Sequence, residues 1–446
     1  MFGRGRCCNR RCDFTTTTTQ LCNGCHSASF CGVPCQRAAW PSHKIDCKHL
    51  SSFLTRHGRA FCDVQANEYA ALAEAGEVLA MMLAAQTCRD NGDYASALEL
   101  DMRAAAGGYA AASYAVGVAL KQAGNIQGAR EAHAIAAAAG VPAAFGALGK
   151  IDKQGGGEGA TERARKYFEQ GDRLGCGFSS LHFAHILFKE RKLVEAFDAF
   201  NRALTDKQNP AVTTEAQEFL GVFHEKGYGC EISVDNALNY YKLATRGGSV
   251  ASPFNMGLML AKLKLYPAAR KSHEIAAARG SGSAMNSLGT MAQFGLGLSA
   301  PDMRAAASWF ERAAAAGNTS GKYNLAVFLV GQGEGLLKYI ERANELAHEA
   351  AATGHPDAMA MAGALDCLQA IHQPDFEVAF AAGRELIDRS AAAGSQTGAM
   401  LAAEYSKPLL PGQRPSIIFP SFSPAVLGIE NVWDENGIFI PLNKRI

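Results

Sequence analysis

The sequence has no long apolar run. Its most apolar stretch, Ala134–Gly149, consists mostly of Ala and Gly and contains Pro142, whereas a helix that spans a membrane needs about 20 strongly apolar residues. The first residues are polar and Arg-rich, without the apolar segment of a secretory signal. We therefore expect no membrane association and an intracellular protein, in the cytoplasm or the nucleus.

An excess of either charge is also absent. Lys and Arg number 43 and Asp and Glu number 42 in 446 residues, a net charge of +1. Proteins that bind nucleic acid usually carry a strong basic excess. Residues 1–50 have a net charge of +5, but aromatic residues are not interleaved with these basic ones. A nucleic-acid partner is therefore not expected.

The cysteines are few beyond residue 47 and dense before it. Eight of the 13 fall in the first 47 residues, and in a reducing compartment such clustering indicates metal binding instead of disulfides. The other five are predicted to be small apolar core residues: Cys62, Cys88, Cys176, Cys230 and Cys367.

Within the cluster the ligands come in four pairs. Zinc is bound tetrahedrally by Cys and His, so eight ligands suffice for two ions. No carboxylate is among them and no position is left open, which predicts structural and not catalytic zinc. A segment this short without an apolar core needs the metal in order to fold. The pairs are Cys7 or Cys8 with Cys12, Cys22 with Cys25, Cys31 with Cys35, and His43 with Cys47.

Several neighbouring residues make the pattern specific. Phe30 precedes Cys31, Gln36 follows Cys35, Trp40 stands between the last two pairs, and the cluster ends in His-Lys-x-x-Cys. Residues 7–47 therefore resemble the MYND finger. The resemblance implies that alternate pairs share an ion, so that one Zn²⁺ takes Cys7, Cys12, Cys31 and Cys35 and the other takes Cys22, Cys25, His43 and Cys47.

The first pair departs from the family, which usually has two residues between these cysteines. Here the pair is Cys7 with four intervening residues or Cys8 with three. Asn9 stands two residues after Cys7, as in longer-spaced fingers of this type, and favours Cys7. His26 and His49 lie close to ligand positions and are interpreted as non-ligands.

The resemblance also implies a peptide site. MYND fingers bind short proline-containing peptides, and Gln36 and Trp40 occupy the positions that line the groove. An aromatic wall suits an extended, polyproline-like ligand. For Trp40, packing over the ions is an equally weighted alternative.

Behind the finger the sequence repeats. An Ala-rich stretch followed by Gly recurs at intervals of 33 to 40 residues, with one interval of 72 in which Phe200–Leu204 has the pattern without the Gly. Nine such units predict an α-solenoid of helix pairs. We expect each Gly to end a helix in a left-handed conformation. The marked segments are Arg103–Gly107, Ala136–Gly140, Gln170–Gly175, Leu243–Gly247, Ala276–Gly280, Ala313–Gly317, Glu349–Gly354 and Ser390–Gly394.

Glycines inside the units carry two further signals. Leu148-Gly149, Leu220-Gly221 and Leu288-Gly289 predict close helix crossings. Units that begin at Leu220 and Leu288 also contain Gly-x-Gly before the second helix. These units resemble the Sel-one-like repeat, a relative of the tetratricopeptide repeat, and the resemblance extends over roughly residues 65–403.

Residues 404–446 change character, because six prolines interrupt helix formation. We predict a tail that caps the last repeats; alternatively Pro408–Pro411 is a ligand for a MYND finger. The predicted fold is thus mainly α, with a small two-zinc finger at 7–47, a solenoid at 65–403 and this tail.

The modules predict a non-enzymatic adaptor or scaffold with two protein partners: a proline-containing peptide at the finger and an unidentified partner on the solenoid. A substrate adaptor for ubiquitin ligation is an alternative, although no F-box-like segment is evident. A methyltransferase is a weaker one, because the Asn-His and Gly-Glu-Glu motifs of SET enzymes are missing. His133 and His273 stand at equivalent places before Ala-rich runs and are interpreted as packing residues.

Overall fold

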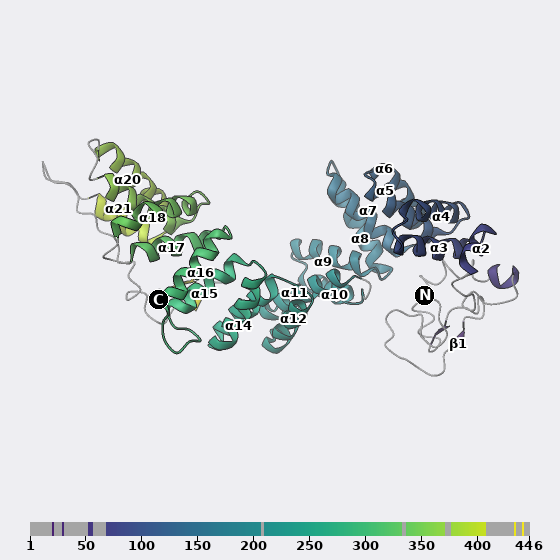
Figure 1. Cartoon of the computed structure of the whole chain (residues 1–446), viewed down its shortest axis with the longest axis horizontal. Helices are drawn as coiled ribbons and strands as arrows, with labels where there is room; N and C mark the ends of the chain where they lie inside the picture. Colours follow the sequence, from purple (N-terminus) through teal and green to yellow (C-terminus); the bar gives the residue numbers. More distant parts are fainter. Residues whose placement is uncertain are drawn as a thin grey trace. The chain divides into compact units, whose positions relative to one another are not determined.

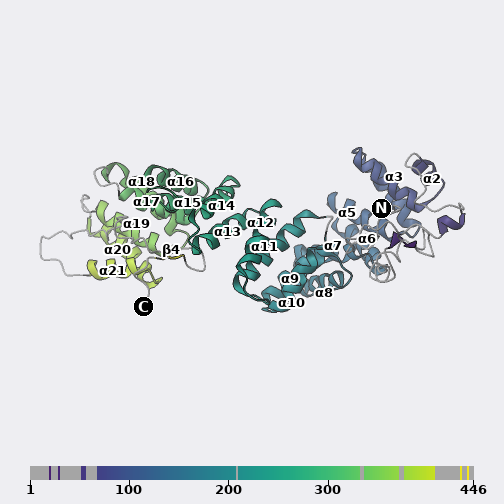
Figure 2. The same ribbon diagram turned by 90° about the horizontal axis from the view of Figure 1, so that it is seen from below.

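A computed structural model describes residues 20–21, 29–30, 52–56, 68–206, 209–331, 336–370, 376–406, 432–433 and 439–440. The chain divides into two compact units, Met1–Tyr240 and Tyr241–Ile446. In each unit successive helices pack side by side and run back and forth (Figures 1 and 2). The described residues are mainly α-helical, in paired repeats, as predicted.

The first unit begins with β1 (Gln20–Leu21) and β2 (Ser29–Phe30), which pair antiparallel. Helices follow from α2 (Tyr69–Glu74) onward. The next eight form four pairs: α3 (Val78–Asp90) with α4 (Tyr94–Ala106), α5 (Ala110–Gln122) with α6 (Ile126–Ala138), α7 (Pro142–Gly155) with α8 (Ala160–Arg173), and α9 (Gly177–Lys189) with α10 (Leu193–Ala203). Helix α11 (Pro210–Lys226) packs on α10.

Helix α12 (Val234–Arg246) contains the boundary between the units. Four further pairs make up the second unit: α13 (Ala251–Lys262) with α14 (Tyr266–Ala278), α15 (Gly282–Gln293) with α16 (Met303–Ala315), α17 (Thr319–Val330) with α18 (Leu336–Ala351), and α19 (Pro356–Ala370) with α20 (Phe376–Ala392). Helix α21 (Gln396–Tyr405) packs on α20. Strands β3 (Val432–Trp433) and β4 (Phe439–Ile440) form a second antiparallel pair.

Side-chain caps start many of these helices. A side-chain oxygen accepts a hydrogen bond from the backbone N–H three residues on, which satisfies one of the free donors of the first turn. Prolines at the first position of α7 and α11 also favour a helix start, because the backbone N–H that proline lacks would have no partner there. The capping residues are Asp93, Asn125, Ser281, Asp302, Asn318 and Ser395.

Six of the eight marker glycines follow the second helix of a pair in the predicted left-handed conformation: Gly140, Gly175, Gly280, Gly317, Gly354 and Gly394. Gly140, for example, has φ of 86° and Gly280 has φ of 88°. In two markers the residue after the predicted glycine takes this role, Gly108 and Gly248. The next residue then donates to a carbonyl of the last turn, as Tyr109 does to Ala104 at 3.1 Å.

A ring from the second helix lies under a glycine of the first helix in several pairs. A Cβ added to Gly149 would meet Phe168 at 2.7 Å, and one added to Gly289 would meet Phe310 at 2.5 Å. This confirms the close crossings predicted at those two sites. In α5/α6 and α13/α14 the ring is a histidine: His133 lies under Gly117 and His273 under Gly257, again at 2.5 Å.

The Gly-x-Gly loops touch the preceding pair. Gly229 has φ of 66°, and a Cβ there would lie 2.4 Å from the carbonyl oxygen of Leu193. Gly297 has φ of 77°, and a Cβ there would lie 2.9 Å from the backbone of Tyr266. Both the left-handed backbone and the lack of space therefore require glycine.

Buried aspartates are neutralised by arginines of neighbouring helices. Asp172 of α8 accepts two hydrogen bonds of 2.8 Å from Arg202 of α10, and Asp101 of α4 pairs with Arg89 of α3 at 2.6 Å. The arginine offsets part of the cost of burying the carboxylate, although at Asp101 burial outweighs Arg89 and raises the pKa of the carboxyl.

The scattered cysteines only partly match their predicted place in the core. Cys367 is fully buried, whereas Cys88, Cys176 and Cys230 are partly exposed. These three lie close to helix ends and the interhelical loop, where neighbouring helices no longer cover them. Cys62 lies outside the described residues.

Candidate functional site

All ten residues predicted for the finger lie outside the described part of the chain: Cys7, Cys12, Cys22, Cys25, Cys31, Cys35, Gln36, Trp40, His43 and Cys47. Between them, the structure describes the hairpin of β1 and β2. Gln20 is opposite Phe30 and Leu21 is opposite Ser29. The predicted tail residues Pro408–Pro411 also lie outside the described residues.

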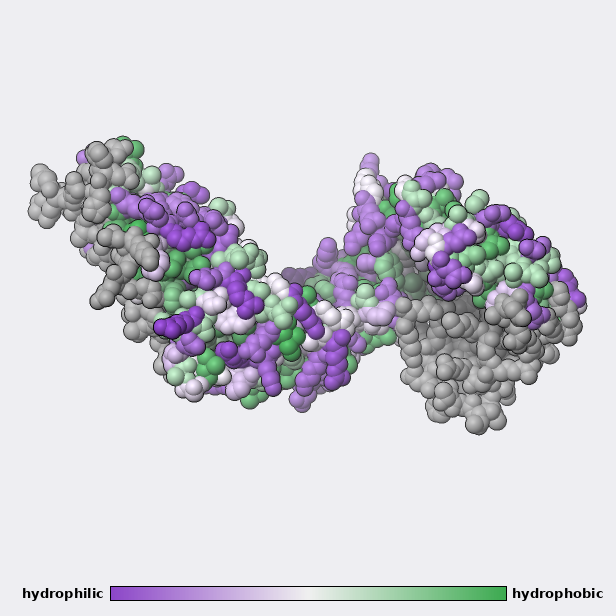
Figure 3. All heavy atoms as spheres, viewed as in Figure 1, coloured by the Kyte–Doolittle hydropathy of each residue, from purple (hydrophilic) through white to green (hydrophobic). Residues whose placement is uncertain are grey.

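The described surface mixes residue types. On the face seen in Figure 3, hydrophilic and hydrophobic residues are interspersed over both units. We therefore looked for a candidate site in a hollow of the surface. A groove of about 500 Å³ lies in the first unit.

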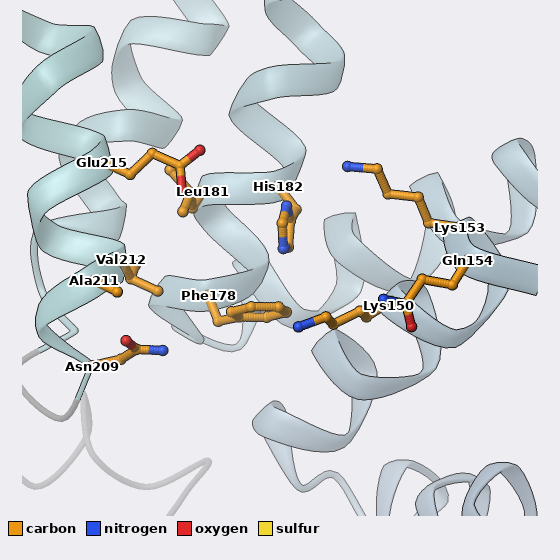
Figure 4. Close-up of a pocket in the computed structure, with 10 residues that line it drawn as sticks. All are labelled: Lys150, Lys153, Gln154, Phe178, Leu181, His182, Asn209, Ala211, Val212 and Glu215. Carbon is orange, nitrogen blue, oxygen red and sulfur yellow. The ribbon is translucent and has the colours of Figure 1, made fainter. Parts of the chain in front are cut away.

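The groove is formed by α7, α9 and α11, the first helices of three successive repeats. Figure 4 shows Lys150 and Lys153 extending from α7 toward Phe178 and His182 of α9, with Glu215 across the groove on α11. Buried Leu181 and Val212 supply apolar surface between them. The remaining lining residues are Gln154, Asn209 and Ala211.

The two sides of the groove differ in charge. On one side, the ammonium of Lys150 lies 5.7 Å from the centre of the Phe178 ring, a cation–π contact. On the other, Glu215 accepts a hydrogen bond of 2.9 Å from Nε2 of His185, which lowers the pKa of the Glu215 carboxyl. The α7 side is therefore basic and the α11 side acidic.

His182 lies between the two sides in a ring cluster. Its imidazole makes an edge contact with Phe178 at 4.4 Å and a tilted one with Phe168 at 4.9 Å. Burial, helped by Lys153 and His185, lowers the pKa of His182 to about 4. Its Nδ1 is buried and has no hydrogen-bond partner among the described residues. At neutral pH this imidazole is uncharged.

Other titratable pairs are scattered over the two units. His348 of α18 contacts both carboxylate oxygens of Asp366 at 3.0 Å, and Cys230 lies 3.6 Å from Nδ1 of His224. Burial raises the pKa of the Cys230 thiol, the opposite of what an activated nucleophile requires. Among the described residues, these pairs do not assemble with a nucleophile and an oxyanion site, and no catalytic domain is evident.

The sequence prediction did not find the groove. Lys150 and Lys153 are three residues apart on one helix face and have no acidic residue three or four positions away. In the sequence, this pair of lysines without a neighbouring acidic residue was the feature that could have pointed to the groove. Its partners Phe178 and Glu215 come from later repeats, so their proximity depends on how the helices stack.

Comparison with known families agrees with the residue patterns. Residues 6–47 match the MYND finger, and residues 214–249, 282–318 and 319–355 match the Sel1 repeat. The chain therefore contains a MYND finger followed by Sel1 repeats, as predicted. Both kinds of module typically mediate protein interactions, and a MYND finger implies zinc binding.

A solved structure shares the repeat fold. A protective antigen of uropathogenic Escherichia coli, c5321, which displays an SLR fold, superposes with a TM-score of 0.61 at 21% identity, covering 75% of this chain and 73% of the antigen. A Sel1 repeat protein from Oxalobacter formigenes has a TM-score of 0.43 at 23% identity, covering 53% of this chain and 92% of its own. No curated protein matches the chain.

Among the described helices, each is too short or too polar to cross a membrane.

Proposed function

We propose that this protein is a zinc-binding adaptor that brings two protein partners together. The finger would bind a short proline-containing peptide through Gln36 and Trp40, and the repeats would bind a second protein. The groove of α7, α9 and α11 supports the second part, since it presents charged, aromatic and apolar side chains from three repeats. We place the finger at 7–47, the solenoid at 65–403 and the tail at 404–446.

The donor set fits two structural zinc ions. Seven thiolates and one imidazole would fill two tetrahedral sites, one with Cys7, Cys12, Cys31 and Cys35 and the other with Cys22, Cys25, His43 and Cys47. When bound, the ions would cross-link a segment that has little core of its own.

Metal analysis of the purified chain tests the zinc assignment. We expect two zinc ions per chain by native mass spectrometry, since eight ligands fill two sites. Cys7→Ser should lose one ion, whereas Cys8→Ser, the matched control, should keep both. A single ion in the wild type would contradict the paired sites, and the reverse result for the two variants would assign Cys8 as the ligand.

Selection from a random-peptide display library tests the adaptor function. Zinc-loaded full-length protein should recover proline-containing peptides, and the Gln36→Ala/Trp40→Ala variant should lose them while it keeps its zinc. Recovery of no peptide by the wild type would overturn the proposal. Retention of the proline peptides by the variant would remove Gln36 and Trp40 from the site.

A further inference from the structure

The lysines of the groove differ from others in the same unit. Lys192 lies 2.7 Å from Glu190, Lys226 3.4 Å from Glu225 and Lys166 3.9 Å from Glu162. Lys150 and Lys153 have no such carboxylate among the described residues, although both point into the groove (Figure 4). Their charges are therefore available to a ligand.

A third lysine adds positive charge near Lys150. Lys121 is the penultimate residue of α5, the first helix of the preceding pair. Burial and the charge of Lys150 lower the pKa of Lys121. The two ammonium groups therefore act on each other, and a bound anion would relieve the repulsion.

From this charge distribution we propose that the groove of α7, α9 and α11 binds an acidic peptide segment of a partner protein. The proposal rests on the adaptor function and names the chemistry of the second partner. Carboxylates of the segment would pair with Lys150 and Lys153, and its apolar atoms would pack on Phe178. The cation–π contact with Phe178 holds the Lys150 ammonium at the groove before binding, which reduces the entropy lost on ordering the side chain.

The acidic side of the groove favours a peptide over a nucleic acid. Glu215 of α11 is held ionised by His185 of α9, and a continuous phosphate backbone across the groove would meet this negative charge. A peptide can place carboxylates toward α7 and a polar or basic residue toward α11. The unpaired carbonyls and N–H groups of such a segment could also reach Gln154 and Asn209 at the rim.

Display selection with groove variants of the full-length, zinc-loaded protein tests this inference. The wild type should recover a class of peptides rich in Asp and Glu, and the Lys150→Glu/Lys153→Glu variant should bind them at least about tenfold more weakly, since two charge-assisted contacts become repulsive. Lys166→Glu is the matched control, because its side chain is 69% exposed and lies outside the groove. It should leave the acidic class bound.

Circular dichroism of each variant establishes that the helices are intact before binding is compared. Recovery of peptides without acidic enrichment, or acidic peptides that the groove variant still binds, would overturn this inference and leave the adaptor function standing. Displacement of the acidic peptides by short oligothymidylate but not by free glutamate-rich peptide would overturn it in favour of a nucleic-acid ligand. Failure to recover any peptide would overturn the adaptor function as well.

Discussion

Single positions decide how closely the helices of a pair approach. In four pairs, a glycine of the first helix lies against a ring of the second helix, which lets the two helices approach closely. The ring is Phe168 or Phe310 in two of these pairs and His133 or His273 in the other two. Burial lowers the pKa of both histidines to about 4, with a further contribution from Lys121 at His133. They are therefore neutral packing residues at neutral pH, as the sequence had suggested.

Replacing His273 by Phe should remove part of the acid sensitivity of the second unit. The unfolded imidazole has a pKa near 6.5 and the folded one about 4, so the folded state binds fewer protons between these values. The stability contribution is complete above pH 6.5 and falls as the pH drops toward 4, by about 3 kcal/mol at most. Phe fits the same place under glycine in other pairs. Urea denaturation from pH 7 to 4.5 should show a growing advantage of His273→Phe over the wild type.

The variant His348→Phe is a suitable comparison, since the imidazole of His348 is partly exposed and lies at the surface beside Asp366. A His273→Phe variant whose advantage stays constant across this pH range would contradict the assignment of a neutral buried imidazole.

A second prediction concerns Lys264, which has φ of 61° after α13, where other turns have glycine. A side chain in this left-handed conformation costs about 1 kcal/mol. Lys264→Gly should therefore raise the urea midpoint, offset in part by the greater freedom of the unfolded chain. Lys264→Ala retains the Cβ and serves as the control; an equal gain in both variants would show that removal of the charge is responsible.

At the scale of elements, helix ends were largely predictable and lateral contacts were not. A glycine after an Ala-rich run readily adopts the left-handed conformation, so this conformation could be predicted for Gly140 and Gly280 from the sequence alone. Arg191 and Lys264 adopt the same conformation without a residue type that signals it. Ion pairs such as Asp172 with Arg202 join helices 30 residues apart and depend on the stacking of the repeats.

The link between α8 and α10 gives a third prediction. Arg202→Ala would leave the carboxylate of Asp172, whose side chain is 7% exposed, without its charge partner. We expect a loss of about 2 kcal/mol, below the range for fully buried pairs because the arginine is itself partly exposed. Arg173→Ala removes a surface pair with Glu169 and should cost less than about 0.5 kcal/mol. Equal shifts of the urea midpoint in the two variants would refute the distinction.

For the whole molecule, the order of modules was evident from the sequence, because ligand spacing and repeat period are local patterns. The groove was not, since Lys150, Phe178 and Glu215 belong to three repeats. The rotation between successive helix pairs decides which of their side chains converge. The sequence of a single repeat does not reveal that rotation. The sequence thus predicts that helix pairs stack, and the structure adds which side chains meet.

Zinc removal provides a prediction at this scale. The described helices from α2 onward lie outside residues 7–47 and have their own buried clusters. A chelator should therefore remove the metal while the helical circular dichroism and its thermal midpoint stay nearly unchanged. A large loss of helical signal would mean that the finger is needed for the repeats to fold.

The buried imidazoles also bear on where the stack would first open. The first unit contains two imidazoles whose pKa burial lowers to about 4, His133 in α6 and His182 in α9, and the second unit contains His273 in α14. Mild acid would therefore loosen the helices that hold these rings, whereas heat or urea usually frays an array from its termini. Amide hydrogen exchange at pH 5 should rise first in α5, α6, α9, α13 and α14, so that protons and denaturants would take the same protein apart in different orders.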